Sequence, residues 1–253
     1  MRLFVCLLVC GELMPRTVQA GPPFVTDDPE PVEYQHWEFY LGSINSKVGS
    51  DWSGTAPHVE VNYGAVSNLQ LHLIAPLAYT APRGGAAHFG YGDTEVGAKF
   101  RFVQETDRMP QIGVFPMLEI PTGSHRNGLG NGSPQGFLPV WLQKSWGKWT
   151  AYGGAGYGIN SGSGNQNWEF GGAVLQRHVT TNLIVGAEIY HRTALQTGAS
   201  DDTAFNVGIV YDFTESHHLL MSAGRSISGP TEFQSYIAYQ YTFEHGLFGA
   251  HPH

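Results

Sequence analysis

The sequence predicts an all-β fold, a single antiparallel transmembrane β-barrel of about 12 strands of the outer-membrane type. Three observations support this prediction. Segments of about ten residues alternate between apolar and polar side chains, which is the period of a strand and not of a helix. The connections between these segments are alternately short and long. Aromatic residues gather near both ends of the segments, as they do in barrels that cross a bilayer.

The composition agrees with a membrane barrel. The chain has 253 residues, of which only 13% are charged and 42% are hydrophobic, and no apolar run approaches the roughly 20 residues of a spanning helix. Because lipid-facing and lumen-facing residues alternate along each strand, the hydrophobic content of such a barrel stays ordinary. The net charge of −8 argues against a nucleic-acid partner, which requires a basic face.

Residues 1–20 are predicted to be a signal peptide, which implies export to the outer membrane. Arg2 precedes a short apolar run, and the small-residue pattern that ends at Ala20 fits a cleavage site. Both cysteines, Cys6 and Cys10, belong to this segment, so the mature chain is expected to contain no disulfide. The alternative is a lipoprotein anchored at Cys10, which fits the local sequence less well.

Residues 21–34 are rich in proline and acidic side chains and are predicted to form a periplasmic or plug-like segment. We favour a flexible lead-in over a plug, because polar termini are usually poorly ordered. The barrel is predicted to occupy residues 35–243. Residues 244–253 are predicted to be a flexible C-terminal tail, whose histidines have no rigid scaffold to fix a metal geometry.

The strands are predicted in order from their alternation and length. The predicted segments are residues 37–46, 58–64, 69–79, 95–102, 112–120, 137–146, 149–159, 168–177, 183–192, 205–213, 219–227 and 236–243. In the third, for example, Leu71 and Leu73 alternate with Gln70 and His72. Most segments are close to the roughly 9–11 residues that a tilted strand needs to cross a bilayer.

The connections place the two ends of the barrel. Short ones are expected at residues 65–68, 105–110, 147–148, 179–182 and 214–217, and looser ones at residues 47–55, 80–93, 122–135, 160–167, 193–202 and 226–232. Short periplasmic turns and longer extracellular loops are typical of outer-membrane barrels. An even number of strands then places both termini on the periplasmic side.

Aromatic residues are predicted to form two belts at the membrane interfaces. The candidates for contact with lipid are Trp37, Tyr63, Phe102, Trp146, Trp149, Trp168, Phe213, Tyr241 and Phe243. The alternative is that aromatics simply favour strand ends in any all-β protein. We favour the belts, because a soluble barrel has no reason to form two of them.

The polar parity of the strands is predicted to face an enclosed lumen. The candidate lumen-lining residues are Glu38, His58, Glu60, His72, Glu95, Lys99, Arg101, Glu119, Glu169, Arg177, Glu188, Arg192 and Asp212. Their acidic excess would favour passage of cations or polar molecules. The alternative, which we favour, is that these groups pair with one another and hold the barrel shut, since buried charges need partners.

Several strand sequences resemble one bacterial family of outer-membrane β-barrel transporters, labelled for the MetA pathway of phenol degradation. The resemblance lies in "GPPFVTDDPEP", "GTAPHVEVNYG", "LQLHLIAPLAY", "GDTEVGAKFRFVQE", "PQIGVFPMLEIPTG" and "HHLLMSAGRSI", and it covers nearly all of the mature chain. It implies a channel for passive passage of small molecules, with aromatic or other organic solutes as the expected cargo. The terminal "YIAYQYTF" is similar to the final strand that the barrel-assembly machinery reads, so this machinery and outer-membrane lipid are the expected partners.

Other functions are weighed against the channel. A purely structural or anchoring barrel is the first alternative, and a lipid-hydrolysing barrel is a weaker one. His218 and Ser222 lie four residues apart in a strand, about 13 Å, and no nucleophile motif surrounds them. The sequence therefore predicts no enzyme activity, no catalytic residue, no metal site and no cofactor.

Overall fold

The computed structural model describes residues 23–244. The predicted signal peptide and residues 245–253 of the predicted tail lie outside this range. The elements are β1 (His36–Val48), β2 (Asp51–Val66), β3 (Leu69–Ala81), β4 (His88–Tyr91), β5 (Thr94–Val103), β6 (Gln111–Val114), β7 (Met117–Ile120), the 3₁₀ helix η1 (His125–Asn127), β8 (Gln135–Trp146), β9 (Trp149–Asn160), β10 (Trp168–His178), β11 (Leu183–Arg192), β12 (Asp202–Asp212), β13 (His217–Ser228) and β14 (Thr231–Glu244).

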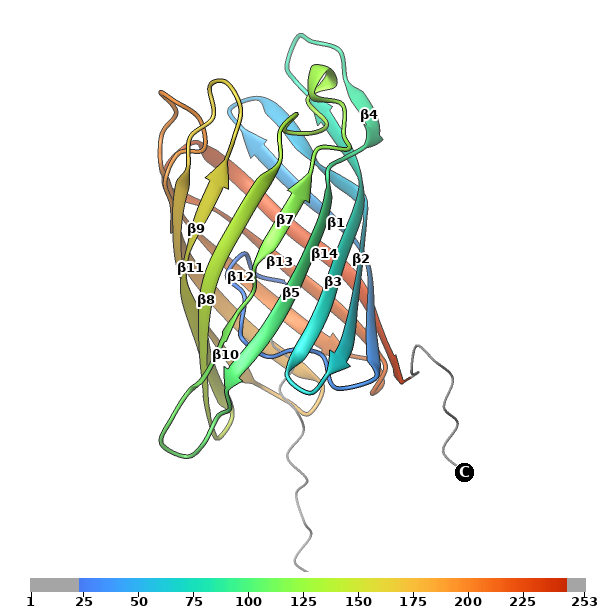
Figure 1. The fold of residues 1–253 in the computed structure, drawn as a ribbon, viewed down its shortest axis with the longest axis vertical. Helices are drawn as coiled ribbons and strands as arrows, with labels where there is room; N and C mark the ends of the chain where they lie inside the picture. The colour runs from blue at the N-terminus through green and yellow to red at the C-terminus, as the bar shows by residue number, and fades with distance from the viewer. Residues whose placement is uncertain (1–22, 245–253) are drawn as a thin grey trace, which may run out of the picture.

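The strands close into one antiparallel barrel (Figure 1). Most strands pair with their neighbours in sequence, and β1 pairs with β14, with Trp37 opposite Phe243. The short strand β4 and the longer β5 both pair with β3, and the short strands β6 and β7 both pair with β5 and β8, so each of these pairs occupies one position in the wall. The predicted barrel of about 12 strands is therefore confirmed.

The two ends of the barrel differ as predicted. β1 begins and β14 ends at the end that carries the turns between β2 and β3 and between β8 and β9 (Figure 1). Two connections predicted to be loose loops are instead two-residue turns. Gly49 and Ser50 alone join β1 to β2, and Gly229 and Pro230 alone join β13 to β14. Gly49 and Gly229 have φ of 59° and 139°, which lets the chain turn tightly there and extends the strands beyond the predicted bounds.

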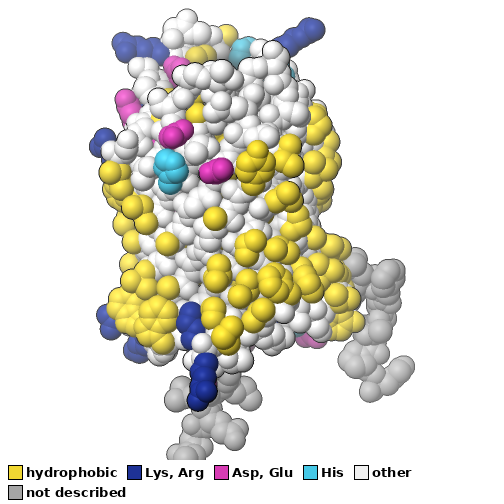
Figure 2. Space-filling model, turned by 60° about the vertical axis from the view of Figure 1, so that its left-hand side comes forward, with side chains coloured by type: hydrophobic (Ala, Val, Ile, Leu, Met, Phe, Trp, Pro, Cys, Tyr) yellow, Lys and Arg dark blue, Asp and Glu magenta, His cyan; other side chains and the backbone are white. Residues whose placement is uncertain are grey.

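The outer wall is apolar. Leu71 and Val207, from the predicted lipid-facing parity, are 46% and 55% exposed. Figure 2 shows hydrophobic side chains spread over the wall between the two ends of the barrel. At the short-turn end Trp37 packs against Tyr63 and Phe243, with ring centroids 4.4 and 6.3 Å apart. An apolar outer wall of this kind matches the hydrocarbon of a bilayer.

Two prolines interrupt the hydrogen-bonded wall between β6, β7 and β8. The ladder pairs Val114 with Val140 and Met117 with Phe137, and the two residues between them on each strand include Pro116 and Pro139. Proline has no N–H to donate to a ladder. The interruption divides one strand into β6 and β7 and leaves the intervening Phe115 side chain buried at 3% exposure.

Within residues 23–244, the structure contains no helix that is both long enough and apolar enough to cross a membrane.

Candidate functional site

Residues 23–35 lie inside the barrel, toward its short-turn end (Figure 1). Thr26 and Asp28 are completely buried, and Pro29 is among the most buried residues of the chain. This segment, called the plug below, lies against the inner faces of several strands. The favoured expectation of a flexible lead-in was therefore wrong, and the plug-like alternative describes these residues.

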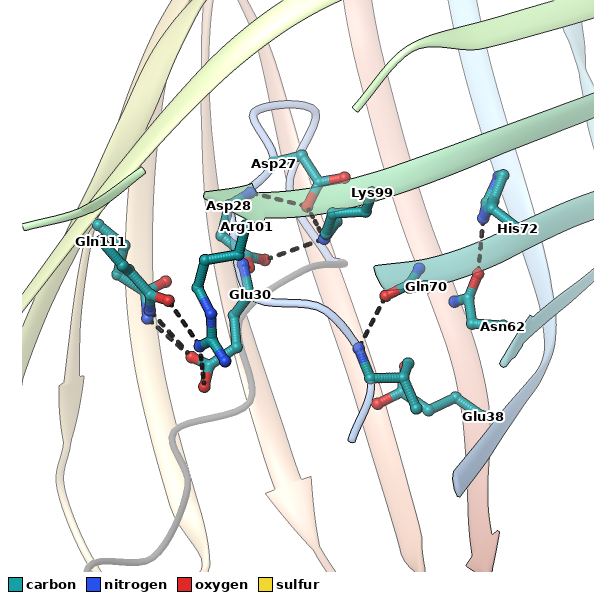
Figure 3. Close-up of polar contacts among 12 residues, drawn as sticks. Asp27, Asp28, Glu30, Glu38, Asn62, Gln70, His72, Lys99, Arg101 and Gln111 are labelled. Carbon is teal, nitrogen blue, oxygen red and sulfur yellow. Dashed lines mark hydrogen bonds and ion pairs between the residues drawn. The ribbon is translucent and has the colours of Figure 1, made fainter. Parts of the chain in front are cut away.

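Two cations of β5 bind the acidic side chains of the plug (Figure 3). The Lys99 Nζ lies 3.0 Å from Asp27 Oδ1 and 3.7 Å from Asp28 Oδ2. Arg101 Nη1 lies 3.6 Å from Glu30 Oε1. Burial raises the pKa of Asp28 well above its ordinary value, although the charge of Lys99 opposes this shift. The acidic side chains that made this segment look flexible in the sequence are here paired with basic side chains of the inner wall.

Neutral side chains bind the other oxygen of the Glu30 carboxylate. The side-chain amides of Gln111 and Gln143 donate to its Oε2 at 3.2 and 3.0 Å. Burial raises the pKa of Glu30, and these two hydrogen bonds with the charge of Arg101 act in the opposite direction. Gln143 is 2% exposed, so this contact is made away from water.

The opposite wall binds the backbone of the plug. Glu188 on β11 accepts hydrogen bonds from the backbone N–H groups of Val25, at 3.2 Å, and Thr26. On β13 the Ser222 hydroxyl donates to the carbonyl of Pro23 at 2.6 Å. These contacts satisfy backbone groups that the plug carries into the barrel outside any ladder.

Glycines in the wall make room for the plug. A Cβ on Gly172 of β10 would lie 2.0 Å from Thr26 Oγ1, and a Cβ on Gly64 of β2 would lie 1.8 Å from the carbonyl oxygen of Glu33. Real atoms do not approach so closely, so a methyl group at Gly64 would meet the backbone of the plug, and one at Gly172 would displace the Thr26 side chain. The inner wall is therefore shaped to the plug at both ends of the segment.

Above the plug lies a chamber of 520 Å³. Its floor is formed by Pro23, Phe24, Val25 and Asp27 of the plug. One side is aromatic and includes Phe115, Phe137 and Trp141. The rings are in contact, since the centroids of Phe137 and Trp141 lie 6.4 Å apart and Phe170 stands edge-on to both. A mostly apolar cavity with a few polar groups is the usual form of a small-molecule site.

The other side of the chamber is polar and internally paired. His72 contacts Glu95 through Nε2 at 3.1 Å and Asn62 through Nδ1 at 2.7 Å. Asn62 donates in turn to Glu60 at 2.8 Å. His58 lies 3.9 Å from the other oxygen of Glu60. The carboxylates of this wall therefore already have partners within the protein.

A second cavity of 460 Å³ adjoins the chamber on the side of the long loops. Both cavities are lined by Ile44, His58, Ile74 and Glu95, so they are stacked along the lumen. Glu119 lines the upper cavity, where it accepts a hydrogen bond from Gln135 at 2.9 Å. The lumen is thus hollow toward the loops and filled toward the short turns.

Most predicted lumen residues lie on the inner face of the barrel. The residues placed there are Glu38, His58, Glu60, His72, Glu95, Lys99, Arg101, Glu119, Glu188, Arg192 and Asp212. Of those not yet placed, Glu38 accepts a hydrogen bond from Tyr40 at 2.7 Å, and Asp212 contacts His218 at 2.7 Å. Many of them pair within the barrel or with the plug.

The predictions for Glu169, Arg177 and Trp168 were wrong. Glu169 and Arg177 are exposed on the outer face of β10, where Arg177 lies over the ring of Trp149 at 5.1 Å. Trp168, predicted to contact lipid, lies inside and stacks on Phe137 with centroids 4.7 Å apart. Tyr190 of β11 is likewise buried inside the barrel at 4% exposure. The other predicted interface aromatics, Trp37, Tyr63, Phe102, Trp146, Trp149, Phe213, Tyr241 and Phe243, lie on the outward parity.

The aromatic wall of the chamber was missed by the sequence analysis. Phe115, Phe137 and Trp141 were not proposed for the lumen, because an apolar residue in a membrane barrel is expected to face lipid. One signal was present, since Trp141 shares a parity in its strand with Gln143, a polar residue expected to face inward.

The candidate hydrolase residues are used otherwise. The Ser222 hydroxyl binds the plug, and His218 pairs with Asp212. Among residues 23–244 there is also no group of three or more histidine, cysteine or acidic side chains placed to hold a metal ion.

Comparison with known proteins gives one family and several similar structures. A family model described as "Putative MetA-pathway of phenol degradation" matches residues 51–243. No curated protein matches. An outer membrane channel from Pseudomonas putida F1 is similar over 85% of this chain and 98% of its own, with a TM-score of 0.71 and 17% identity.

Two further barrels have lower similarity. The KdgM porin covers 82% of this chain and 99% of its own at a TM-score of 0.54 and 12% identity. The translocator domain of the autotransporter NalP from Neisseria meningitidis covers 82% of this chain and 87% of its own, with a TM-score of 0.51 and 11% identity. At such identities the likeness establishes the outer-membrane barrel fold alone.

Proposed function

Since this chain belongs to the family described as "Putative MetA-pathway of phenol degradation", we propose that it is an outer-membrane channel for passive passage of small organic solutes that carry an aromatic ring. The family description and the barrel fold set the class of protein. The aromatic chamber above the plug is the observation that carries the choice of solute.

The chamber suits a ring-bearing solute in size and in chemistry. A volume of 520 Å³ lies within the range of small-molecule sites. Phe115, Phe137 and Trp141 offer ring faces and edges, which favour other aromatic rings by offset or edge-on contact. Strongly hydrated ions gain little from such a wall, because its apolar surface cannot replace their water.

The stacked cavities supply a path from the loop end to the plug. A solute that enters between the loops meets the upper cavity first and then the chamber, whose floor is the plug. The plug would therefore have to shift for a solute to continue straight to the short-turn end. Its contacts are hydrogen bonds and ion pairs, which are made and broken without covalent change.

The test is entry into proteoliposomes of two neutral, membrane-impermeant sugars that differ by a ring. We expect phenyl β-glucoside to enter faster than the smaller methyl β-glucoside. Trp141→Ala should abolish this preference, whereas Trp149→Ala on the outer face should leave it unchanged. Entry that follows size alone would contradict the aromatic selectivity, and entry of neither sugar would support the anchoring alternative.

A further inference from the structure

Arg192, at the end of β11, is a cation of the chamber without a partner. Its side chain lines the chamber, and its Nε is buried with no hydrogen-bond partner. No ion pair joins it to any carboxylate among residues 23–244. The residue opposite it on β12 is Asp202, but both oxygens of that carboxylate accept hydrogen bonds from the hydroxyls of Ser226 and Thr231.

A second donor without a partner lies in the same chamber. Trp141 is 1% exposed and lines the chamber, yet its indole Nε1–H has no hydrogen-bond partner. An indole nitrogen can only donate, and no acceptor among residues 23–244 reaches it. Leaving a buried donor unpaired is costly, which makes this position informative.

The two donors flank one aromatic wall. Phe170 is the residue of β10 directly opposite Arg192 in the ladder. Its ring centroid lies 6.0 Å from that of Trp141 and 6.1 Å from that of Phe137. Arg192 and Trp141 therefore both neighbour Phe170, and both line the chamber.

The geometry points to a subsite for a small aromatic acid, with its carboxylate held by Arg192 and Trp141 and its ring against Phe137. This inference rests on the proposed function, because it specifies the charge of the solute that the chamber accepts. A guanidinium matches a carboxylate with two parallel hydrogen bonds. An amine would need a free carboxylate instead, and Glu60 and Glu95 already have partners.

The subsite is tested by calorimetric binding of three probes of similar size to the purified full-length protein. These are benzoate, benzylamine and benzyl alcohol. We expect benzoate to bind most tightly. Arg192→Gln should weaken the binding of benzoate about tenfold or more, as loss of a charge-assisted hydrogen bond does. It should change the affinity for benzyl alcohol by less than about twofold. Trp141→Phe, which keeps the ring and removes the donor, should weaken benzoate several-fold.

Matched controls use the outer face. Arg177→Gln and Trp149→Phe remove the same groups where they contact each other outside the barrel, and should not change benzoate binding. Arg192→Lys keeps the charge but loses the planar fork, so its affinity for benzoate should be intermediate. It also provides a second test if Arg192→Gln does not fold, as judged by mobility of unheated protein on SDS gels.

The outcomes separate the subsite from the channel. Equal benzoate affinity in the wild type and in the folded Arg192 variants would overturn the subsite, as would benzylamine binding as tightly as benzoate. Arg192-dependent benzoate binding in a protein that admits neither glucoside would uphold the subsite and overturn the channel. Ring-selective glucoside entry without Arg192-dependent benzoate binding would do the reverse.

Discussion

The two halves of the lumen treat charge in opposite ways. In the lower half Lys99 and Arg101 meet acidic side chains of the plug at 3.0 and 3.6 Å. In the upper half Arg192 has no protein carboxylate as a partner among the described residues. The same residue types thus perform different tasks along one barrel. Where the plug supplies carboxylates, Lys99 and Arg101 hold the plug in place. Arg192 has no such carboxylate and is available to bind a solute.

The two halves of the lumen also differ in how tightly their side chains pack. Around the plug, wall glycines are in contact with the inserted chain, and Thr26 is completely buried. Above it, the aromatic wall and the paired polar side chains line a chamber of 520 Å³. The barrel itself is therefore wide enough to be hollow, and closure at the short-turn end depends on one segment of about a dozen residues.

Removing the plug is expected to have the largest effect on this difference. A chain that joins residues 1–20, the predicted signal peptide, directly to residue 35 should show several-fold higher conductance in planar bilayers than the full chain, because the lower lumen becomes as hollow as the upper. Its selectivity should also move toward anions, since Lys99 and Arg101 lose Asp27, Asp28 and Glu30 as partners. A chain that lacks residues 245–253 is the control. Unchanged conductance would mean that the barrel wall closes the lumen without the plug.

Lys99→Met tests how strongly the lower half depends on its ion pairs. The substitution leaves Asp27 and Asp28 without their cation, and breaking a buried pair from one side costs about 3–5 kcal/mol. Lys144→Met is the matched control, because Lys144 pairs with Glu105 at 2.9 Å while both side chains remain partly exposed, and such pairs are worth about 1 kcal/mol or less. Urea unfolding in lipid bilayers measures both. Equal losses of stability would contradict the view that the plug is held by buried charge.

The architecture was predictable from the sequence because lipid imposes a simple rule on each strand. Outward residues such as Leu71 and Val207 must be apolar, so the period of two is preserved along most of the chain. β10 breaks the rule. Gly171, Gly172 and Ala173 occupy both parities at its centre and leave no clear apolar face. Glu169 and Arg177 lie near its two ends, where charged groups reach water or lipid headgroups.

The plug and the chamber could not be predicted from local patterns. The burial of Asp27, Asp28 and Glu30 depends on cations more than 60 residues away in the sequence, and no periodicity connects the two segments. The aromatic wall was missed because Phe137 and Trp141 are apolar, like lipid-facing residues. Only the parity that they share with Gln143 in β8 pointed to the lumen.

The smallest expected effect tests the fit between the plug and the wall. A Cβ on Gly172 would lie 2.0 Å from Thr26 Oγ1, whereas the nearest atom to a Cβ on the adjacent Gly171 is 3.9 Å away. Gly172→Ala should therefore cost about 1–3 kcal/mol through overpacking, with a modest rise in conductance as the plug shifts, and Gly171→Ala should change neither.

Thr26 Oγ1 is buried without a hydrogen-bond partner, so Thr26→Ala alone should cost little. Adding Thr26→Ala to Gly172→Ala should then restore most of the lost stability, because it removes the atom that the new methyl group meets. Urea unfolding of the four proteins completes the cycle, and independent, additive effects of the two substitutions would show that the plug does not rest on this part of β10.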